Sequence, residues 1–556
     1  MHLSRLLPTT LLALSLFASA AHASDSLTVA TKDGKVQGAL TTDGQVRAFE
    51  GIPYAAPPVG NLRWQPPQPA AKWHGTLTTT SFGSHCIQST AYPDMVFHDP
   101  GPSEDCLTLN VWTPANARPG TLPVMVWVYG GGFTSGGTSE ARQDGQFLAH
   151  RNVVIVSMNY RLGIFGFFAH PELTAESPHH ASGNYGLMDQ AAALTWVKQN
   201  IRNFGGDPSN ITLFGESAGS FSVSSLMASP FSRGLISKAI GESGGAFYSG
   251  GLSYPALAKA ELDDAVFAKA AFGTSNLADL RKLSPDDLVK AATAKTGVPD
   301  GRSLPVGVAT TPRPPRFGPD VDGYFLPNSV PALYAAGKQA HVPLLAGWNA
   351  DEARGTIVMA PVKPTTASFA AQAATEFGDR AKDFLAVYPD TTDAEAIRSA
   401  GDFASDRFIV YSTWAWLEAQ VKTGNAPVYR YRFDLGSPGD THHPAAIGAF
   451  HSDDIEYVFG TLDSRDGATW RPEDRALSNQ IGQYWTNFAR TGDPNGVPNG
   501  RSLSGGAQNS ADLPKWPTYA PADGLQVMHL DATSTAAPDT QRPRYLFLQT
   551  IWSKPQ

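Results

Sequence analysis

A Gly-x-Ser-x-Gly motif directly follows a short apolar run in the stretch Ile211-Thr212-Leu213-Phe214-Gly215-Glu216-Ser217-Ala218-Gly219. The residues before the motif predict a buried strand, and those from Ser220 to Met227 favour a helix after it. This arrangement is typical of a nucleophile elbow, in which a tight turn strains the backbone of the serine and the flanking glycines prevent clashes. The stretch therefore predicts that the Ser217 hydroxyl is a nucleophile, exposed above the sheet of an α/β fold.

A second glycine-rich turn follows another apolar run. Val124 to Val128 predicts a buried strand, which leads into Tyr129-Gly130-Gly131-Gly132-Phe133. Consecutive glycines let backbone N–H groups converge on a small anion without interference from side chains, as the oxyanion of an acyl-transfer reaction requires. The N–H of the residue after the nucleophile, here Ala218, completes such a hole in hydrolases of this type. No Gly-Lys-Ser or Gly-Lys-Thr follows the glycines, so a phosphate-binding loop fits less well.

The apolar pattern of the rest of the chain predicts the fold class. Several short runs are continuously apolar, as in strands that are buried on both faces, and helical stretches such as 188–200 lie between them. This order favours an α/β fold with a central, mostly parallel sheet flanked by helices. Residues 254–296 favour helices inserted near the edge of the sheet. No break in composition divides the chain, so we expect a single domain over residues 24–556. The remaining predicted strands are 153–156, 342–346 and 428–431.

A serine nucleophile needs a base, and in α/β hydrolases the chain order is serine, acid, histidine. Histidines that follow Ser217 are His341, His442, His443, His451 and His529. His529 lies in an apolar, strand-like segment, and His442 and His443 lie in a loop rich in Pro, Gly and Asp. His341 precedes a predicted strand and leaves no room for the acid after that strand. Spacing therefore favours His451 as the base without excluding the other candidates.

The acid of such a triad is expected after the predicted strand over residues 342–347. Two adjacent carboxylates follow that strand, in Asn349-Ala350-Asp351-Glu352. The spacing fits either side chain, and a carboxylate pair after a strand is usually solvated. Asp351 and Glu352 are therefore both candidates on this argument alone.

Composition and charge exclude several other classes of protein. The chain has 556 residues, 42% of them hydrophobic, with 42 basic and 50 acidic side chains and a net charge of −8. A disordered chain has fewer apolar residues, and a nucleic-acid-binding protein has a basic surface. Neither an anionic membrane surface nor nucleic acid is therefore an expected partner.

The N-terminus has the pattern of a cleaved signal peptide, predicted over residues 1–23. Arg5 supplies the positive charge, an apolar run extends from Leu11 to Phe17, and Ala21-His22-Ala23 offers small residues for the peptidase. The apolar run is much shorter than the roughly 20 residues of a membrane span, so no membrane anchor is expected. We therefore expect an exported protein, either secreted or periplasmic. In such an oxidising compartment Cys86 and Cys106 are expected to form a disulfide.

These residues together resemble the type-B carboxylesterase family, the cholinesterase-like branch of the α/β hydrolases. The resemblance covers nearly all of the chain after residue 23. It rests on the elbow and on six further motifs: Phe49-Glu50-Gly51-Ile52-Pro53-Tyr54-Ala55, Ser103-Glu104-Asp105-Cys106-Leu107, Asn159-Tyr160-Arg161-Leu162-Gly163, Gly183-Asn184-Tyr185-Gly186-Leu187-Met188-Asp189-Gln190, Phe204-Gly205-Gly206-Asp207-Pro208 and Ile455-Glu456-Tyr457-Val458-Phe459-Gly460.

The resemblance implies roles for individual residues. It implies that Ser217 is the nucleophile, Glu352 the triad acid and His451 the base. The oxyanion hole would then be formed by Gly131, Gly132 and Ala218, and the triad would be supported by Glu216 and Ser243. Cys86 and Cys106 match the first disulfide of the family, and Arg63 and Glu104 match a structural ion pair. No cofactor or metal is implied.

Three departures from the family pattern concern the site. Ala353 follows the acid, and Ser452 follows the base, where the family usually has glycine. No tryptophan occurs between Ile87 and Asp105, where cholinesterases hold a quaternary ammonium by cation–π attraction. The resemblance therefore implies an ester hydrolase that is not a cholinesterase.

We expect an exported serine carboxylester hydrolase that acts through an acyl-enzyme on small to medium esters, with aromatic, feruloyl-type and bulky alkyl esters all open. Two alternatives are a non-catalytic binding module, which usually lacks the nucleophile or the base, and an amidase with the same triad. The imidazole must be neutral to act as a base, so activity is expected to fall on the acid side of neutrality. The sequence does not indicate the oligomeric state.

Overall fold

The computed structural model describes residues 27–89, 92–247, 253–294, 316–496 and 513–552. The predicted signal peptide, residues 1–23, lies outside these ranges. No helix within them is both long enough and apolar enough to cross a membrane.

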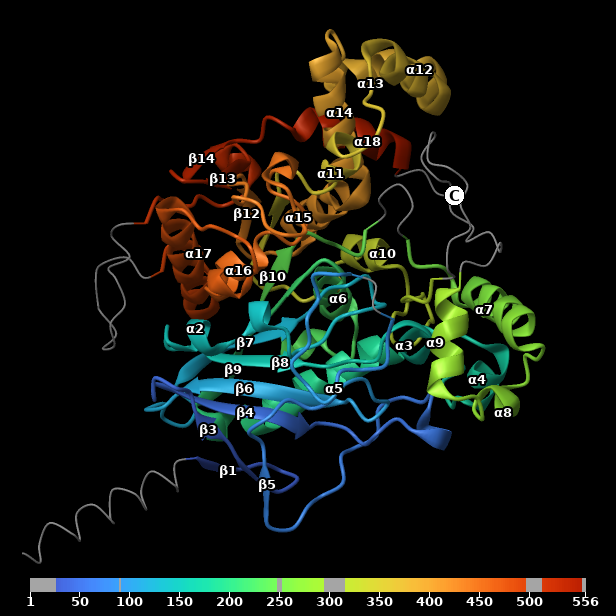
Figure 1. Ribbon diagram of the computed structural model, residues 1–556, viewed down its shortest axis with the longest axis vertical. Coiled ribbons are helices and arrows are strands. Elements are labelled where there is room, and N and C mark those ends of the chain that lie inside the picture. The colour runs from blue at the N-terminus through green and yellow to red at the C-terminus, as the bar shows by residue number, and fades with distance from the viewer. Residues whose placement is uncertain (1–26, 90–91, 248–252, 295–315, 497–512, 553–556) are drawn as a thin grey trace, which may run out of the picture.

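One large mixed sheet runs through the molecule, and Figure 1 shows helices on both of its faces. Its strand order is β14-β13-β12-β11-β10-β9-β7-β8-β6-β4-β3, and the seven strands from β13 to β8 are parallel, with antiparallel strands at both edges. This confirms the predicted α/β fold with a central, mostly parallel sheet. The strands are β3 (Ala39–Leu40), β4 (Val46–Pro53), β6 (Thr108–Pro114), β7 (Leu122–Val128), β8 (Val154–Met158), β9 (Gly206–Glu216), β10 (Lys238–Glu242), β11 (Leu344–Asn349), β12 (Val428–Phe433), β13 (Gln526–Leu530) and β14 (Thr535–Pro538).

A smaller sheet near the N-terminus has the strand order β1-β2-β5. It comprises β1 (Thr28–Ala30), β2 (Lys35–Gln37) and β5 (Thr76–Thr78).

Burial on both faces explains why the central strands were visible in the sequence. Val124, Val126 and Val128 of β7 are fully buried, and so are Met125 and Trp127, which alternate with them. A strand whose two faces are both covered has no polar face, so its residues form a continuous apolar run. The five strands predicted from such runs are all present, as β7, β8, β9, β11 and β12.

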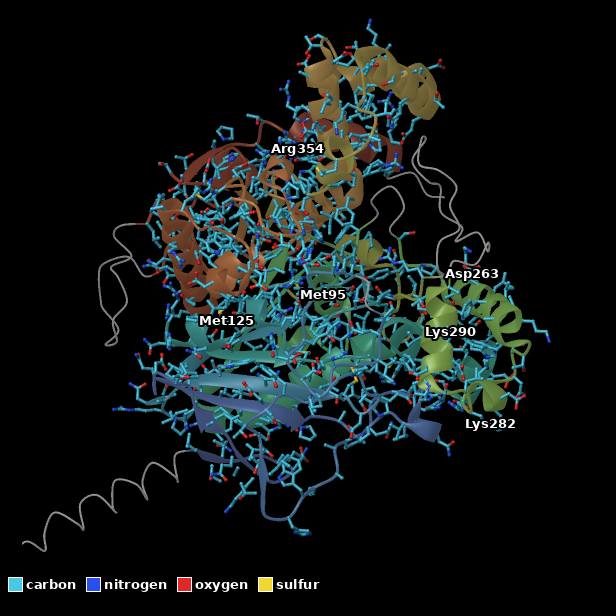
Figure 2. All side chains as sticks on the ribbon, viewed as in Figure 1. Met95, Met125, Asp263, Lys282, Lys290 and Arg354 are labelled. Atoms are coloured by element: carbon cyan, nitrogen blue, oxygen red, sulfur yellow. A yellow bond between two sulfur atoms is a disulfide. The ribbon has the colours of Figure 1, made fainter. Side chains whose placement is uncertain are left out.

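Helices cover the sheet and extend from it in two places. The predicted helical insertion at residues 254–296 is confirmed as α7, α8 and α9, which lie together at one side of the molecule, where Figure 2 shows Asp263, Lys282 and Lys290. A second excursion, α12 to α14, lies at the far end (Figure 1). The helices are α2 (Gln146–Ala149), α3 (Gly163–Phe167), α4 (Pro171–Glu176), α5 (Tyr185–Asn200), α6 (Ala218–Ala228), α7 (Leu257–Phe272), α8 (Leu277–Leu280), α9 (Pro285–Thr293), α10 (Val330–Ala335), α11 (Gly355–Val358), α12 (Thr366–Phe377), α13 (Ala381–Val387), α14 (Asp393–Ser405), α15 (Tyr411–Thr423), α16 (Ile455–Phe459), α17 (Pro472–Thr491) and α18 (Arg542–Trp552).

The register of the parallel strands aligns the carboxyl ends of four of them on one side of the sheet. Val128, Gly215, Gly241 and Ala346 form one row across β7, β9, β10 and β11. The glycine turn, the predicted nucleophile and Glu352 all follow this row, each beyond the carboxyl end of its strand. In open α/β sheets, ligands bind in the crevice outside these carboxyl ends.

Two structural pairs restrain the segment between β5 and β6: one lies within the segment, and the other joins it to the rest of the chain. Cys86 and Cys106 form the predicted disulfide. Arg63 pairs with Glu104 through two hydrogen bonds of 2.6 and 2.7 Å, and also donates to the backbone carbonyl of Leu283 at 2.8 Å. The ion pair implied by the family resemblance is therefore present, and it also anchors the helical insertion.

Candidate active site

The predicted elbow has the strained backbone that its sequence indicates. Ser217 has φ of 53° and ψ of −121°, a conformation that residues with a side chain rarely adopt. The turn is this tight because α6 packs directly against β7. An added Cβ on Gly215 would lie 2.6 Å from the carbonyl oxygen of Val128, and one on Gly219 only 1.9 Å from it. Only glycine fits at either position.

The glycine turn after β7 lies beside the elbow. Gly131 and Gly132 have φ of 99° and 65°, which glycine adopts at little cost. Within the described residues, the N–H groups of Gly131, Gly132 and Ala218 donate to no protein acceptor. Unpaired N–H groups beside a serine hydroxyl are available to a developing oxyanion.

Ser217, His451 and Glu352 come together in a single hydrogen-bonded chain. The His451 Nε2 atom lies 2.9 Å from the Ser217 Oγ atom, and its Nδ1 atom lies 2.6 Å from Glu352 Oε2. Ser243 donates to the other oxygen of Glu352 at 2.5 Å, and the N–H of Asn349 donates to the same oxygen at 2.8 Å. The Glu352 side chain is completely buried, and these donors together with His451 hold both of its oxygens in place.

The structure places the alternative acid away from the imidazole. Asp351 accepts a hydrogen bond from the N–H of Ala449 at 3.1 Å and pairs with Arg354 at 3.1 Å. It therefore ties the histidine loop to β11, while its neighbour Glu352 faces His451.

The other candidate histidines lie elsewhere in the structure. His341 is near the carbonyl of Gly337, His443 pairs with Asp440, and His529 pairs with Asp434. His442 stands beside His443 in the same loop. Within the described residues none of these four histidines pairs with Ser217, whereas His451 does.

Glu216 sets the charge around the imidazole. Its Oε1 atom lies 3.3 Å from His451 Nε2, and its side chain is 3% exposed. Burial raises the pKa of Glu216, and the neighbouring His451 imidazole opposes this shift. Burial alone would lower the pKa of His451, but the facing carboxylates of Glu216 and Glu352 outweigh it and raise that pKa to about 9. The Glu216 carboxyl can take this position only because residue 130 is glycine: a Cβ on Gly130 would lie 2.6 Å from Glu216 Oε2.

Three residues at the site were not predicted from the sequence. The ring of Phe408 meets the His451 ring edge-on, with centroids 4.8 Å apart, and Phe408 is 38% exposed. It belongs to the π-helical turn η6 (Asp406–Val410), whose irregularity leaves no periodic signal in the sequence. Tyr92 and Met95 lie beside the glycine turn, 3.5 Å and 3.2 Å from the positions of a Cβ on Gly132 and Gly131. Only their place in the loop between the two cysteines pointed to them.

This arrangement has the parts that acyl transfer requires: a hydroxyl bonded to an imidazole, a carboxylate that orients the imidazole, and free N–H donors. No group of three or more His, Cys, Asp or Glu side chains in the described ranges is arranged to hold a metal ion.

Comparison with known proteins identifies relatives over almost the whole chain. A model described as the carboxylesterase family matches residues 25–547. The chain is 38% identical to fumonisin B1 esterase of Sphingopyxis macrogoltabida, over 84% of this chain and 82% of that protein. It is 34% identical to para-nitrobenzyl esterase of Bacillus subtilis strain 168, over 93% and 98%. A solved structure of a PNB esterase matches with a TM-score of 0.74 at 32% identity, covering 94% of this chain and all of the other.

Proposed function

The chain belongs to the carboxylesterase family and is a carboxylic ester hydrolase, and we propose that it works through an acyl-enzyme formed on Ser217. The 2.9 Å contact between Ser217 Oγ and His451 Nε2 carries this proposal. A hydroxyl and an imidazole are thus in direct contact beside the free N–H groups of Gly131, Gly132 and Ala218, which supports the proposal.

In the proposed mechanism, neutral His451 takes the hydroxyl proton of Ser217 as the oxygen attacks the ester carbonyl. Glu352 holds the Nδ1–H tautomer and stabilises the imidazolium that forms. Gly131, Gly132 and Ala218 donate their N–H groups to the oxyanion. His451 then gives its proton to the departing alcohol. Water attacks the acyl-enzyme in the same way, releasing the carboxylic acid and restoring the serine.

Two features weigh against the alternative functions. Ser217, His451 and Glu352 are all in hydrogen-bond contact, whereas a non-catalytic binding module has no need of this arrangement. An amidase would use the same triad, but it must also protonate a poorer leaving group. The relatives described above carry esterase names, which favours esters.

The proposed substrates are small to medium carboxylic esters, including aromatic ones. The name para-nitrobenzyl esterase refers to an aromatic ester, which supports this extension. Phe408, Tyr92 and Met95 offer apolar and aromatic surface next to the reacting groups, as an acyl or alcohol group of this kind would need.

Hydrolysis of a p-nitrophenyl acyl series by the wild type and Ser217→Ala tests the proposal. We expect Ser217→Ala to lower kcat by about 10⁴- to 10⁶-fold, because the covalent intermediate cannot form. A matched p-nitroanilide should be cleaved far more slowly than the ester by the wild type. Equal activity of Ser217→Ala would contradict the acyl-enzyme, and faster cleavage of the anilide would favour the amidase.

We also propose that the protein is exported and begins near Ser24 after cleavage. The N-terminal pattern and the disulfide between Cys86 and Cys106 support this proposal. Mass spectrometry of the protein recovered from the periplasm or medium should give a chain that lacks residues 1–23. An uncleaved chain confined to the cytoplasm would contradict it.

A further inference from the structure

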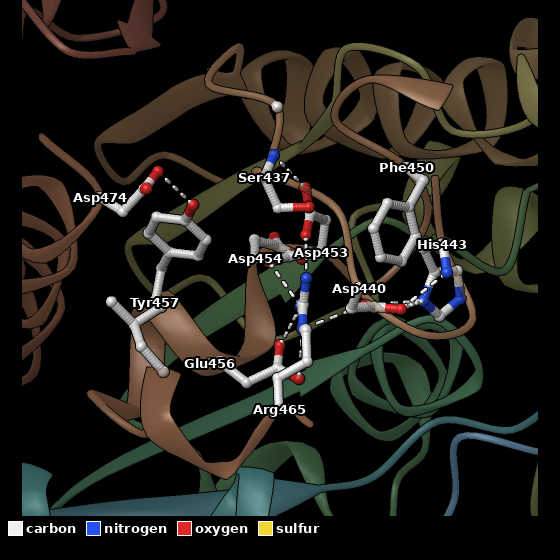
Figure 3. A network of polar contacts seen from close by, with 12 residues as sticks. Ser437, Asp440, His443, Phe450, Asp453, Asp454, Glu456, Tyr457, Arg465 and Asp474 are labelled. Atoms are coloured by element: carbon white, nitrogen blue, oxygen red, sulfur yellow. Dashed lines mark hydrogen bonds and ion pairs between the residues drawn. The ribbon is translucent and has the colours of Figure 1, made fainter. Parts of the chain in front are cut away.

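The Arg465 guanidinium, which lies outside the triad, binds residues of the loop that carries His451. Arg465 follows the short helix η8 (Leu462–Ser464), and its side chain is 10% exposed. Figure 3 shows it among three carboxylates from two segments. It pairs with Asp453 at 2.6 Å and with Glu456 at 2.6 Å, and its Nε atom lies 3.8 Å from Asp440.

Arg465 contacts the histidine loop on both sides of the base. Asp453, two residues after His451, is bound directly. Phe450, the residue before His451, lies with its ring centroid 5.4 Å from the Arg465 guanidinium carbon and stacks on the His443 ring at 4.1 Å. Figure 3 shows Phe450, His443 and Asp440 together on one side of Arg465, to the right in this view.

Arg465 also binds α16, the helix that follows the loop. Glu456 belongs to the first turn of α16, and Arg465 binds both of its carboxylate oxygens, at 3.2 and 2.6 Å. The loop between these contacts includes Ser452, whose φ of 67° is unfavourable for a residue with a side chain. The contacts of Arg465 therefore bracket both the base and the strained residue after it.

The other restraints on this loop act on different atoms. Asn349 holds the carbonyl of Phe450 at 2.7 Å, and Asp351 holds the N–H of Ala449. The Asp453 carboxylate has the Arg465 guanidinium and the N–H of Ser437 as its partners. Burial raises the pKa of Asp453 to about 7 even though Arg465 opposes this shift. Without the guanidinium, the buried carboxylates of Asp453 and Glu456 would lose the cation that pairs with both of them, which is costly for buried charges. Asp440 would keep its pair with His443.

We propose that Arg465 is a positioning residue for the base, holding the His451 imidazole in line with Ser217 through its contacts with Phe450, Asp453 and Glu456. This inference rests on the proposed role of His451 as the base. Arg465 does not reach the reacting atoms. It acts by keeping the loop that carries the imidazole from moving when the proton is transferred.

Arg465→Gln and Arg465→Lys test this role against a matched arginine variant. Arg475→Gln removes a guanidinium of α17 from an exposed pair with Asp463 of η8, so it should leave kcat unchanged. We expect Arg465→Gln to lower kcat for p-nitrophenyl acetate by about 10- to 100-fold with KM within about twofold, because a displacement of about 1 Å has that effect. Arg465→Lys keeps the positive charge but loses the planar guanidinium that binds several carboxylate oxygens at once, so its kcat should be intermediate.

A double-mutant cycle with His451→Ala separates positioning from general structural support. If Arg465 acts through the imidazole, Arg465→Gln should change the residual rate of His451→Ala by less than about twofold. An equal loss in both backgrounds would overturn the proposal, and so would an unchanged kcat in Arg465→Gln. If Arg465→Gln does not fold, Arg465→Lys decides: reduced kcat at an unchanged melting temperature supports positioning, and unchanged kcat overturns it. Full activity of His451→Ala alone would instead overturn the proposed base.

Discussion

The carboxyl group of Glu216 lies on the same side of His451 as the serine that the imidazole must activate. Its Oε1 atom is 3.3 Å from Nε2, and Ser217 Oγ is 2.9 Å from the same nitrogen. A negative charge there stabilises the imidazolium of the transition state, but it also holds a proton on the resting imidazole. Because the negative charge favours the protonated imidazole, the pKa of His451 is raised to about 9.

Glu216→Gln should therefore shift the acid limb of kcat/KM to lower pH. Activity needs the neutral imidazole, so it rises with pH through the pKa of His451. Removing one facing negative charge lowers that pKa, and we expect the limb to move down by about one pH unit or more. The measurement is kcat/KM for p-nitrophenyl acetate between pH 5 and 10. The control is Glu473→Gln on α17, a partly exposed carboxylate that pairs with Arg471. An unmoved limb would show that Glu216 does not set the proton affinity of the base.

The sequence predicts individual residues of the site where the local backbone conformation requires a recognisable motif. Ser217 and its glycines form one continuous motif, so they could be assigned from the residues alone. Asp351 and Glu352 are neighbours, and only the direction of each side chain separates the acid from a residue that ties the loop. Phe408 contacts the His451 ring, and Arg465 contacts the loop that carries His451. Neither residue belongs to a motif, so neither could be assigned to the site.

The contact between α6 and β7 depends on one glycine. A Cβ on Gly219 would lie 1.9 Å from the Val128 carbonyl oxygen, which belongs to the backbone of a central strand and cannot rotate away. The helix that starts at the nucleophile and the strand that leads to the oxyanion glycines are thus held at a fixed, short separation.

Gly219→Ala should separate these two elements and disturb both halves of the site. We expect a loss of about 1–3 kcal/mol in the free energy of unfolding, since an added methyl in a packed interface has this cost, together with a large loss of kcat. Gly234→Ala is the matched control, because a Cβ at that exposed position meets no atom within 4 Å. Urea denaturation and p-nitrophenyl acetate hydrolysis measure both effects. If the two variants behave alike, the close approach is not what positions the elbow.

Elements differ in how well their sequence predicts them, for a physical reason. β7, β8 and β9 are buried on both faces, and this leaves continuous apolar runs that are easily recognised. The π-helical turn η6 inserts into a helical segment between α14 and α15 without changing its composition. The excursion α12 to α14 follows Glu352 and was not predicted, because it contains no motif that relates it to the site.

Segments from most of the chain length meet at the carboxyl edge of the sheet. The glycine turn, the elbow and the acid follow β7, β9 and β11, while the base lies in the long connection after β12. The parallel register that aligns the strands is what lets a sequence motif at one strand end predict a partner at another. The Cys86–Cys106 loop is a further wall of this site, since it carries Tyr92 and Met95 to the oxyanion glycines.

Removing the disulfide should lower the free energy of unfolding of the protein and make the Cys86–Cys106 loop more mobile. The bond closes a loop with a sequence separation of 20 residues, and both sulfurs belong to buried residues. Loop-closure entropy predicts that Cys86→Ser/Cys106→Ser loses about 3 kcal/mol of unfolding free energy. The triad lies on other segments, so kcat should stay near the wild-type value, while KM for p-nitrophenyl esters should rise because Tyr92 and Met95 are less firmly held.

Urea denaturation and steady-state kinetics, each with and without dithiothreitol, measure the two effects separately. Reductant should move the wild type towards the double variant and leave the double variant unchanged, which shows that the disulfide and not the serine substitution is responsible. Equal stability of the two proteins without reductant would mean that Arg63, paired with Glu104 and bound to Leu283, already holds the loop. A fall in kcat at constant KM would instead place the effect of the loop on the oxyanion glycines and not on substrate binding.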